Sequence, residues 1–378
     1  MCAETLRYPQ EPSRFNLHVW DEILLWAARE QGASDITVQT ERAVWVDIKG
    51  QLYPVTQRSL DKPEVEELLN AIWGANGSAE IARGRDLDMS YEVQVPGHRH
   101  QRVRFRVNAT GVLADGRDGI QVTLRVLPEK PPRLEDLDIE PGLREALFPA
   151  NGMVVITGPT GSGKTTLLGA VIRSKVEAPE NHRKVLTYEA PIELVYDEVV
   201  GPHSFVSQSE IPWHLPDFAA GARNALRRKP TDILVGECRD PETIKASAEA
   251  ANTGHVLYTT SHANGVAETI SRMLSVFGPE ERPTRAAEIG DNLKLVCTQL
   301  LVPDVNGGRV AAREYLVFDE EVRGALFDAE PKDWSAVVRT KLASHGRAIT
   351  DAVADLYAEG RISATTRDHI ADRRRLKG

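Results

Sequence analysis

The sequence lacks the features that mark secreted, zinc-binding and membrane-spanning proteins. Its three cysteines, Cys2, Cys238 and Cys297, are scattered and form no CxxC pair. A disulfide framework requires paired cysteines and a zinc site requires closely spaced ligands, so neither is indicated. No apolar run approaches the roughly 18 residues that span a bilayer, and the N-terminus lacks the basic and then apolar pattern of a secretion signal. We therefore expect a cytoplasmic protein without a transmembrane segment.

An excess of positive charge is also missing. The chain holds 46 lysines and arginines against 55 aspartates and glutamates, which gives a net charge of −9. A general nucleic-acid binder needs a basic face for its phosphate contacts. No direct nucleic-acid binding is therefore expected, although a local basic surface is compatible with this balance.

The 378 residues are enough for two domains and a small appendage. Helical spacing of apolar residues predicts a helix over 18–30 and another over 61–74. Alternation with period two predicts a hairpin over 34–55 and two further strands, over 102–113 and 118–128. The first 126 residues are therefore expected to form an α+β domain, with helices on one face of a sheet.

A proline-rich stretch, residues 127–142, separates this domain from the rest. It holds four prolines in sixteen residues, and proline resists both helix and sheet, so we interpret it as a linker or hinge. Over residues 143–330, short β-branched runs alternate with helical stretches, which predicts a mainly parallel sheet buried on both faces. Residues 331–378 predict a helical C-terminal segment. The expected class of this second part is α/β.

One motif stands between a predicted strand and a predicted helix. The sequence "GPTGSGKT" fits the pattern GxxxxGK[ST], and that context supports it as a phosphate-binding loop. Glycines let backbone N–H groups turn toward phosphates, and the helix N-terminus adds partial positive charge. The alternative is a glycine-rich turn that binds nothing. The predicted nucleotide-binding residues are Gly158, Pro159, Thr160, Gly161, Ser162, Gly163, Lys164, Thr165 and Thr166, with Lys164 on the β- and γ-phosphates and the Thr165 hydroxyl on Mg²⁺.

Acidic residues follow two other apolar runs. Glu237 ends the run "DILVGE", where a carboxylate can hold Mg²⁺ or orient the attacking water. Asp232 begins that run, so it is a poor candidate ligand. Glu189 and Glu193 follow the run "KVLTY". From the residues alone, Glu237 is the preferred candidate, and the alternative for each of these glutamates is a solvent-exposed strand end.

Two histidines, His255 and His262, flank the apolar run "VLYTT". A histidine near a γ-phosphate can donate a hydrogen bond or respond to hydrolysis. Taken alone, each is more often a structural residue held by hydrogen bonds.

Together these motifs resemble a known family. "GPTGSGKT", "TYEAPIE", "LRRKPTDILVGECRDPET" and "TGHVLYTTSHANG" match, in order and spacing, the Walker A, Asp, Walker B and His boxes of the secretion-superfamily ATPases. "SDITVQ", "RFRVNA" and "LRVLP" resemble the PilT branch. "VSQSEIP", "NALRRKP" and "REYLVFDEEVR" resemble the DotB type of type IVB secretion ATPases and their conjugal-transfer relatives.

The resemblance implies a RecA-like P-loop ATPase domain preceded by a PAS-like α+β domain, with a short helical C-terminal tail. It also implies a homo-hexamer that binds ATP and Mg²⁺ between the two domains. Arginines of the N-terminal domain complete such a site, where each can stabilise the charge that develops on phosphate. The candidates are Arg104, Arg106, Arg117 and Arg125. Parity places Arg104 and Arg106 on the same strand face, and the alternative for each is a solvent-facing strand residue.

By motif alignment Glu193 corresponds to the catalytic glutamate of the Asp box and Glu237 to that of the Walker B box. The family usually has an aspartate where this chain has Ala190. Handling of Mg²⁺ and water is then left to Glu189, Glu193 and Glu237, with Thr165 and Glu237 as the expected metal ligands.

The resemblance implies an ATPase motor at the cytosolic face of a membrane-embedded secretion or conjugation complex, associated peripherally with the inner membrane. One alternative is a type IV pilus retraction motor. Another is a nucleotide-gated interaction module that binds ATP without hydrolysing it, for which Ala190 is the supporting feature.

Overall fold

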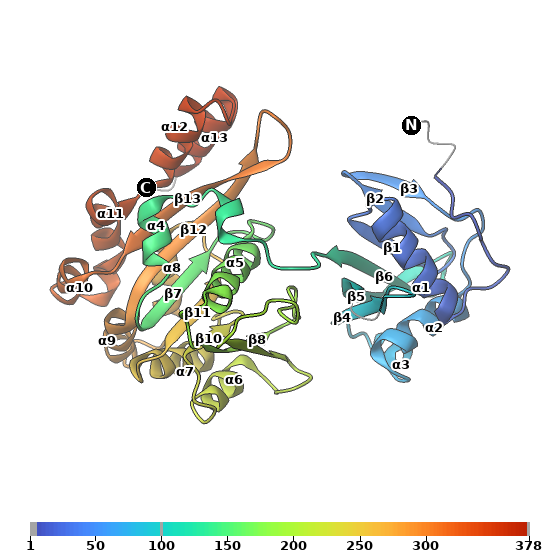
Figure 1. The fold of residues 1–378 in the computed structure, drawn as a ribbon, viewed down its shortest axis with the longest axis horizontal. Coiled ribbons are helices and arrows are strands. Elements are labelled where there is room, and N and C mark those ends of the chain that lie inside the picture. Colours follow the sequence, from blue (N-terminus) through green and yellow to red (C-terminus); the bar gives the residue numbers. More distant parts are fainter. Residues whose placement is uncertain (1–5, 99–100, 376–378) are drawn as a thin grey trace. The chain divides into compact units, whose positions relative to one another are not determined.

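The computed structural model describes residues 6–98 and 101–375, so Cys2 lies outside the described residues. The chain divides into two compact units (Figure 1). The N-terminal unit comprises residues 1–129 together with 191–195, and the C-terminal unit comprises residues 130–190 and 196–378. The division falls inside the stretch that the sequence marks as a linker.

The N-terminal unit is built on a six-stranded antiparallel sheet in the order β3-β2-β1-β6-β5-β4. Its strands are β1 (Asp35–Gln39), β2 (Trp45–Ile48), β3 (Gln51–Pro54), β4 (Leu87–Gln94), β5 (Arg102–Ala114) and β6 (Arg117–Leu127). Its helices are α1 (Leu17–Leu25), α2 (Lys62–Trp73) and α3 (Gly77–Ala82), with a π-helical turn, η1 (Trp26–Glu30), after α1. One core joins Trp20 of α1 and Leu68 of α2 to Phe105 and Leu124 of the sheet. The α+β organisation agrees with the sequence, and the PAS-like assignment stays a prediction.

The C-terminal unit is an α/β fold around an eight-stranded sheet in the order β14-β13-β12-β7-β11-β10-β8-β9. The six strands from β12 to β9 run parallel, while β13 and β14 are antiparallel additions at one edge. The strands are β7 (Gly152–Thr157), β8 (Lys184–Glu189), β9 (Phe205–Glu210), β10 (Asp232–Val235), β11 (Val256–Ser261), β12 (Leu293–Pro303), β13 (Arg309–Val317) and β14 (Gly346–Arg347).

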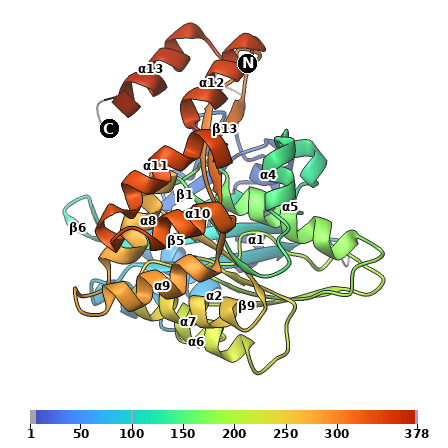
Figure 2. The ribbon, with the colours of Figure 1, turned by 90° about the vertical axis from the view of Figure 1, so that its left-hand side faces the viewer.

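Helices cover both faces of this sheet, as the continuous apolar strands predicted. Tyr188 and Ile233 face one core, and Ile156 and Leu234 face another that also contains α5. Figure 2 shows α9, α10 and α11 side by side on the outside of this unit. The helices are η2 (Leu134–Leu137), α4 (Pro141–Ala146), α5 (Lys164–Glu177), α6 (Phe218–Ala225), α7 (Pro241–Asn252), α8 (Val266–Ser275), α9 (Arg282–Asn292), α10 (Glu320–Phe327), η3 (Pro331–Asp333), α11 (Trp334–His345), α12 (Ile349–Ala358) and α13 (Ala364–Arg375).

The proline-rich stretch is folded over most of its length. It contains η2 and the start of α4, and Leu134 is buried in the core that contains α5. Arg173 of α5 donates a 2.6 Å hydrogen bond to the Pro131 carbonyl. Only the first residues of the predicted linker therefore lie outside the C-terminal unit.

Candidate active site

The glycine-rich loop lies at the carboxyl end of β7 and leads into α5, as the motif predicted. Its glycines Gly158, Gly161 and Gly163 have φ angles of +142°, +74° and +81°, a region that L-residues with side chains rarely adopt. A Cβ atom on Gly158 would lie 2.3 Å from the main-chain oxygen of Gln299. Both the backbone conformation and the close neighbour therefore require glycine at this position.

Lys164 begins α5 and is buried beneath the loop. Its ammonium donates hydrogen bonds to the carbonyl oxygens of Gly158 (2.9 Å) and Pro159 (3.0 Å). Thr165 is half-buried and Thr166 exposed on the first turn of the helix. The loop thus combines a cation, a helix N-terminus and backbone N–H groups, which is the donor set that binds a phosphate group.

The strand that carries Glu237 is not the direct neighbour of β7. In the sheet, β11 lies between β7 and β10, so the loop after β11 separates the phosphate loop from Glu237. That loop is attached to the end of β7, because the Thr157 hydroxyl accepts from the Ala263 N–H at 2.9 Å and donates to the Ala263 carbonyl. This attachment brings His262 to the phosphate loop.

His262 and Glu237 face each other within this unit. The His262 Nε2 atom lies 3.9 Å from Oε1 of Glu237, and Arg239 lies 3.7 Å from the other carboxylate oxygen. Burial and then the neighbouring Lys164 ammonium hold the pKa of His262 below its ordinary value of 6.5. The His262 imidazole, the Glu237 carboxylate and the phosphate loop are therefore grouped at the carboxyl ends of the parallel strands.

Glu189 also lies at the carboxyl ends of the parallel strands. It ends β8, and the pairing of Tyr188 with Val235 places it beside Gly236, the residue before Glu237. Its buried carboxylate accepts hydrogen bonds from Thr187 (2.6 Å) and from Gln208 (3.1 Å).

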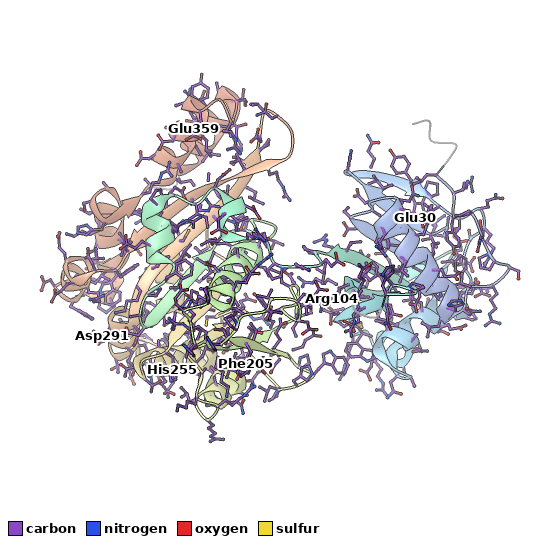
Figure 3. The ribbon with its side chains drawn as sticks, in the orientation of Figure 1. Glu30, Arg104, Phe205, His255, Asp291 and Glu359 are labelled. Atoms are coloured by element: carbon purple, nitrogen blue, oxygen red, sulfur yellow. The ribbon has the colours of Figure 1, made fainter. Side chains whose placement is uncertain are left out.

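Glu193 belongs to the N-terminal unit and contacts two of the predicted arginines. Arg104 donates hydrogen bonds to the carbonyl oxygens of Ile192 (3.0 Å) and Glu193 (3.3 Å). Arg106 donates to the Glu193 carboxylate at 3.1 Å and to Asp88 at 2.9 Å. Both arginines therefore lie on one face of β5, as parity predicted (Arg104 is labelled in Figure 3).

The two remaining arginines have other surroundings. Arg125 is opposite Arg106 in the β5–β6 ladder and donates a 2.9 Å hydrogen bond to Asp35. Arg117 begins β6 at the hairpin, opposite Ala114.

His255 is not placed at the site, which corrects the sequence-based expectation (Figure 3). It precedes β11, whose first residue pairs with Gly152 and whose last pairs with Thr157. The length of β11 therefore separates it from the phosphate loop, about 17–20 Å at the rise of a strand. Its Nδ1 atom is 2.9 Å from the Thr253 hydroxyl and 3.2 Å from the Ala250 carbonyl. These contacts indicate a structural role at the end of α7.

Sequence reasoning missed two buried polar residues behind the loop. Gln299 donates a 2.7 Å hydrogen bond to the Ser162 carbonyl, and Arg313 donates a 2.8 Å hydrogen bond to Gln299. A signal was available, because Gln299 stands within the mostly apolar run "LVCTQLLV" and Arg313 follows the apolar residues "VAA" of "RVAAREYLV". A polar residue in such a run needs a partner.

Comparison with known proteins identifies the family. Residues 18–322 match the family described as "Type II/IV secretion system protein". The chain belongs to this family. It is an ATPase of the secretion and pilus type, and its relatives include proteins named as ATPases.

Three relatives show the range of this similarity. The X-ray structure of the Legionella pneumophila ATPase DotB is 45% identical, covers 96% of this chain and 98% of its own, and gives a TM-score of 0.88. The crystal structure of the pilus retraction motor PilT with bound ADP is 26% identical, covers 94% of this chain and 96% of its own, and gives a TM-score of 0.76. The type IV pilus retraction ATPase PilT of Pseudomonas aeruginosa is 30% identical over 342 residues, 90% of this chain and 95% of the relative.

The site residues also fit Mg²⁺ in the manner of a nucleotide site. Within residues 6–98 and 101–375, no group of three histidine, cysteine or acidic side chains could hold a metal ion alone. A magnesium ion shared with phosphates needs only one or two protein oxygen ligands, and Thr165 and Glu237 supply that type of donor. In the same described part, no helix has the length and apolar character of a membrane-spanning segment.

Proposed function

We propose that the protein is a hexameric ATPase of the cytoplasm that associates with the inner membrane through a type IVB secretion or conjugal transfer complex and powers that complex. The observation that carries the proposal is the similarity to Legionella pneumophila DotB, 45% identity over 96% of the chain, against 26% for the structure of PilT. Ala190 agrees with this branch, because the resemblance suggests that the DotB type tolerates a small residue where the wider family usually has an aspartate.

In this proposal ATP lies on residues 158–166, with Lys164 on its β- and γ-phosphates. Bound Mg²⁺ would neutralise phosphate charge, and the Thr165 hydroxyl and the Glu237 carboxylate would hold it. Glu193 and Glu237 together polarise the attacking water, and Glu189 supports the acidic edge from its buried position. His262 donates a hydrogen bond to the γ-phosphate.

Arginines of the N-terminal unit, a PAS-like domain in this proposal, stabilise the charge that develops on the phosphate. Arg104 and Arg106 are the leading candidates, because both contact the segment that carries Glu193. Arg125 is the third. Loss of the γ-phosphate releases these contacts, and the N-terminal unit then rotates on the hinge at the start of residues 127–142. Phosphate-dependent contacts convert a local change of charge into domain movement in this way.

Gene replacement in the source organism tests the assignment to a machine. A strain whose only copy carries Lys164→Ala is expected to lose substrate export or plasmid transfer and to keep pilus-dependent surface movement. The matched control is Lys245→Ala, a change on α7 outside the phosphate loop, with immunoblots to show equal protein levels. Native mass spectrometry with Mg²⁺ and a non-hydrolysable ATP analogue is expected to show a six-subunit species.

A second candidate is a type IV pilus retraction ATPase. It is favoured by the 30% identity to Pseudomonas aeruginosa PilT over nine-tenths of the chain. The same Lys164→Ala strain distinguishes the two, because loss of surface movement with normal export or transfer would support retraction.

A further inference from the structure

Buried polar side chains connect the phosphate loop to the segment of residues 131–140. Gln299 follows Thr298, which pairs with Thr157 at the end of β7, so Gln299 lies where the phosphate loop begins. It is 3% exposed, and its amide nitrogen donates to the Ser162 carbonyl at 2.7 Å. Gln299 therefore supports the backbone of the loop from inside the protein.

Arg313 holds Gln299 from the neighbouring strand. The two residues are directly paired in the β12–β13 ladder, and Nε of Arg313 donates to the Gln299 side-chain oxygen at 2.8 Å. The other guanidinium nitrogens donate to the carbonyl oxygens of Leu137 and Asp138, each at 2.8 Å, and to the Glu140 carboxylate at 3.3 Å. A guanidinium has five donors and no acceptor, and these oxygens accept from the donors of a side chain that is only 3% exposed.

The geometry makes the phosphate loop and residues 131–140 depend on each other through Gln299 and Arg313. Because Arg313 occupies the amide oxygen of Gln299, the amide nitrogen must face the loop. Lys164 donates to the carbonyl oxygens of Gly158 and Pro159, and turning toward a phosphate would remove that donor. The backbone of Gly158 also packs closely against that of Gln299, since a Cβ on Gly158 would lie 2.3 Å from the main-chain oxygen of Gln299. A shift of the loop must therefore move Gln299 or be resisted by it.

The connection continues to the C-terminal segment. Glu140 also accepts a 2.7 Å hydrogen bond from Arg347, and Arg347 donates to Asp355 of α12 at 2.6 Å. The segment of residues 131–140 is thus connected on one side to Arg313 and Gln299, which support the phosphate loop, and on the other side to helix α12.

We propose that Arg313 and Gln299 are positioning residues that couple the conformation of the phosphate loop to residues 131–140, the folded part of the stretch after the N-terminal unit. The inference rests on the proposed binding of nucleotide by residues 158–166. It adds that nucleotide binding at the loop changes the backbone of residues 131–140, and that Arg313 transmits the change.

Hydrogen–deuterium exchange of the full chain, with and without Mg²⁺-ADP, tests this coupling. In the wild type, ADP is expected to slow exchange over residues 158–166 and to change exchange over 131–140. In Arg313→Met the slowing over 158–166 persists and the change over 131–140 is lost. Turnover of ATP is expected to fall about 10²-fold with KM nearly unchanged, as for a misplaced site that still binds.

The matched control is Arg282→Met. Arg282 donates to two main-chain carbonyls of the same unit, those of Leu274 (3.2 Å) and Phe277 (3.0 Å), away from the phosphate loop. It is expected to show the wild-type response at both segments. If circular dichroism shows that Arg313→Met does not fold, Arg313→Lys takes its place, because its single ammonium cannot reach Gln299 and both carbonyls together.

Three results would overturn the coupling. The first is that ADP changes exchange over residues 131–140 in the Arg313 variant as much as in the wild type. The second is that ADP slows exchange over residues 158–166 in the wild type but leaves residues 131–140 unchanged. The third is that the Arg313 variant no longer binds ADP, which would make Arg313 and Gln299 a simple support of the loop. No protection of residues 158–166 in the wild type would instead contradict the proposed nucleotide site.

Discussion

Arg106 donates a 3.1 Å hydrogen bond to the carboxylate of Glu193. The same guanidinium donates to Asp88, and this hydrogen bond raises the pKa of Arg106 above its ordinary value. Two residues that the sequence assigned to hydrolysis are thus paired within one compact unit. Any change at Arg106 is expected to alter the orientation of Glu193.

The Arg106→Ala variant is expected to reduce ATP turnover by about 10³-fold or more, the lower end of the effect of an arginine on phosphoryl transfer. The matched control is Arg102→Ala. Arg102 lies four residues earlier on the same strand and pairs with Glu92 at 2.7 Å. Phosphate release at saturating Mg²⁺-ATP measures both. Equal losses in the two variants would show that general charge on β5, not Arg106 itself, supports hydrolysis.

The C-terminal unit contains a buried ion pair between α5 and β10. The Lys175 ammonium is 2.5 Å from Asp232, and the two side chains are 4% and 0% exposed. Asp232→Asn leaves a buried charge without its counter-ion and is expected to lower the free energy of unfolding by about 3–5 kcal/mol. The double variant Lys175→Met/Asp232→Leu should recover most of that loss. Urea unfolding measures each.

A control for this pair is Glu288→Gln. Glu288 pairs with Arg285 at 2.6 Å on α9, where both side chains are partly exposed and water weakens the ion pair. We expect its unfolding curve to stay near that of the wild type. An Asp232→Asn variant as stable as Glu288→Gln would contradict the structural role given to the buried pair.

Two glycines of the phosphate loop separate the effect of backbone strain from that of a direct clash. Gly161→Ala meets no atom within 4 Å and suffers only from the positive φ, a cost of about 1–2 kcal/mol. Gly158→Ala adds a clash, because its Cβ would lie 2.3 Å from the main-chain oxygen of Gln299. Fluorescent ADP titration is therefore expected to show a much larger loss of affinity for Gly158→Ala. The reverse order would contradict the loop geometry.

The described cysteines are expected to be unreactive in the folded protein. Burial raises the pKa of Cys238 to about 11 and that of Cys297 to about 12, from an ordinary 9. Because only the thiolate reacts, iodoacetamide at pH 8.5 should modify neither until urea unfolds the chain. Unfolded thiols also ionise above pH 9 while the folded ones stay protonated, so these groups lower stability as pH rises through 9. Peptide mass mapping in a Cys2→Ser background reads both sites, and modification in the native protein would contradict their burial.

The local chemistry could be predicted from the sequence, because it depends on neighbours in the chain. The glycine pattern between a strand and a helix located the phosphate loop, and the helix predicted over 61–74 agrees with α2, whose N-cap is Asp61. Parity placed Arg104 and Arg106 on one face. Strand order was not available, and so the sequence did not show that β11 separates β7 from β10.

The remaining differences come from contacts between residues far apart in the chain. His255 and His262 flank one strand, and a strand puts its two ends at opposite edges of a sheet, so only His262 reaches the site. The proline-rich stretch folds because Arg173 and Arg313 supply donors to its carbonyl groups. Helix α3 and strand β4 were not predicted. Helix α3 has only six residues and so gives a weak pattern, whereas β4 has the period-two alternation of a strand, with Leu87, Met89 and Val93 buried, and that signal was missed.

The most direct test of the account is hydrolysis by a Glu237→Gln variant. The amide keeps the size of the side chain and removes the charge that would activate water, so turnover is expected to fall by about 10²–10⁴-fold. Affinity for ADP should stay close to that of the wild type, and Glu242→Gln, an exposed glutamate at the start of α7, should hydrolyse normally. Wild-type turnover in Glu237→Gln would contradict the central claim that the catalytic site lies at the carboxyl ends of the parallel strands in the C-terminal unit.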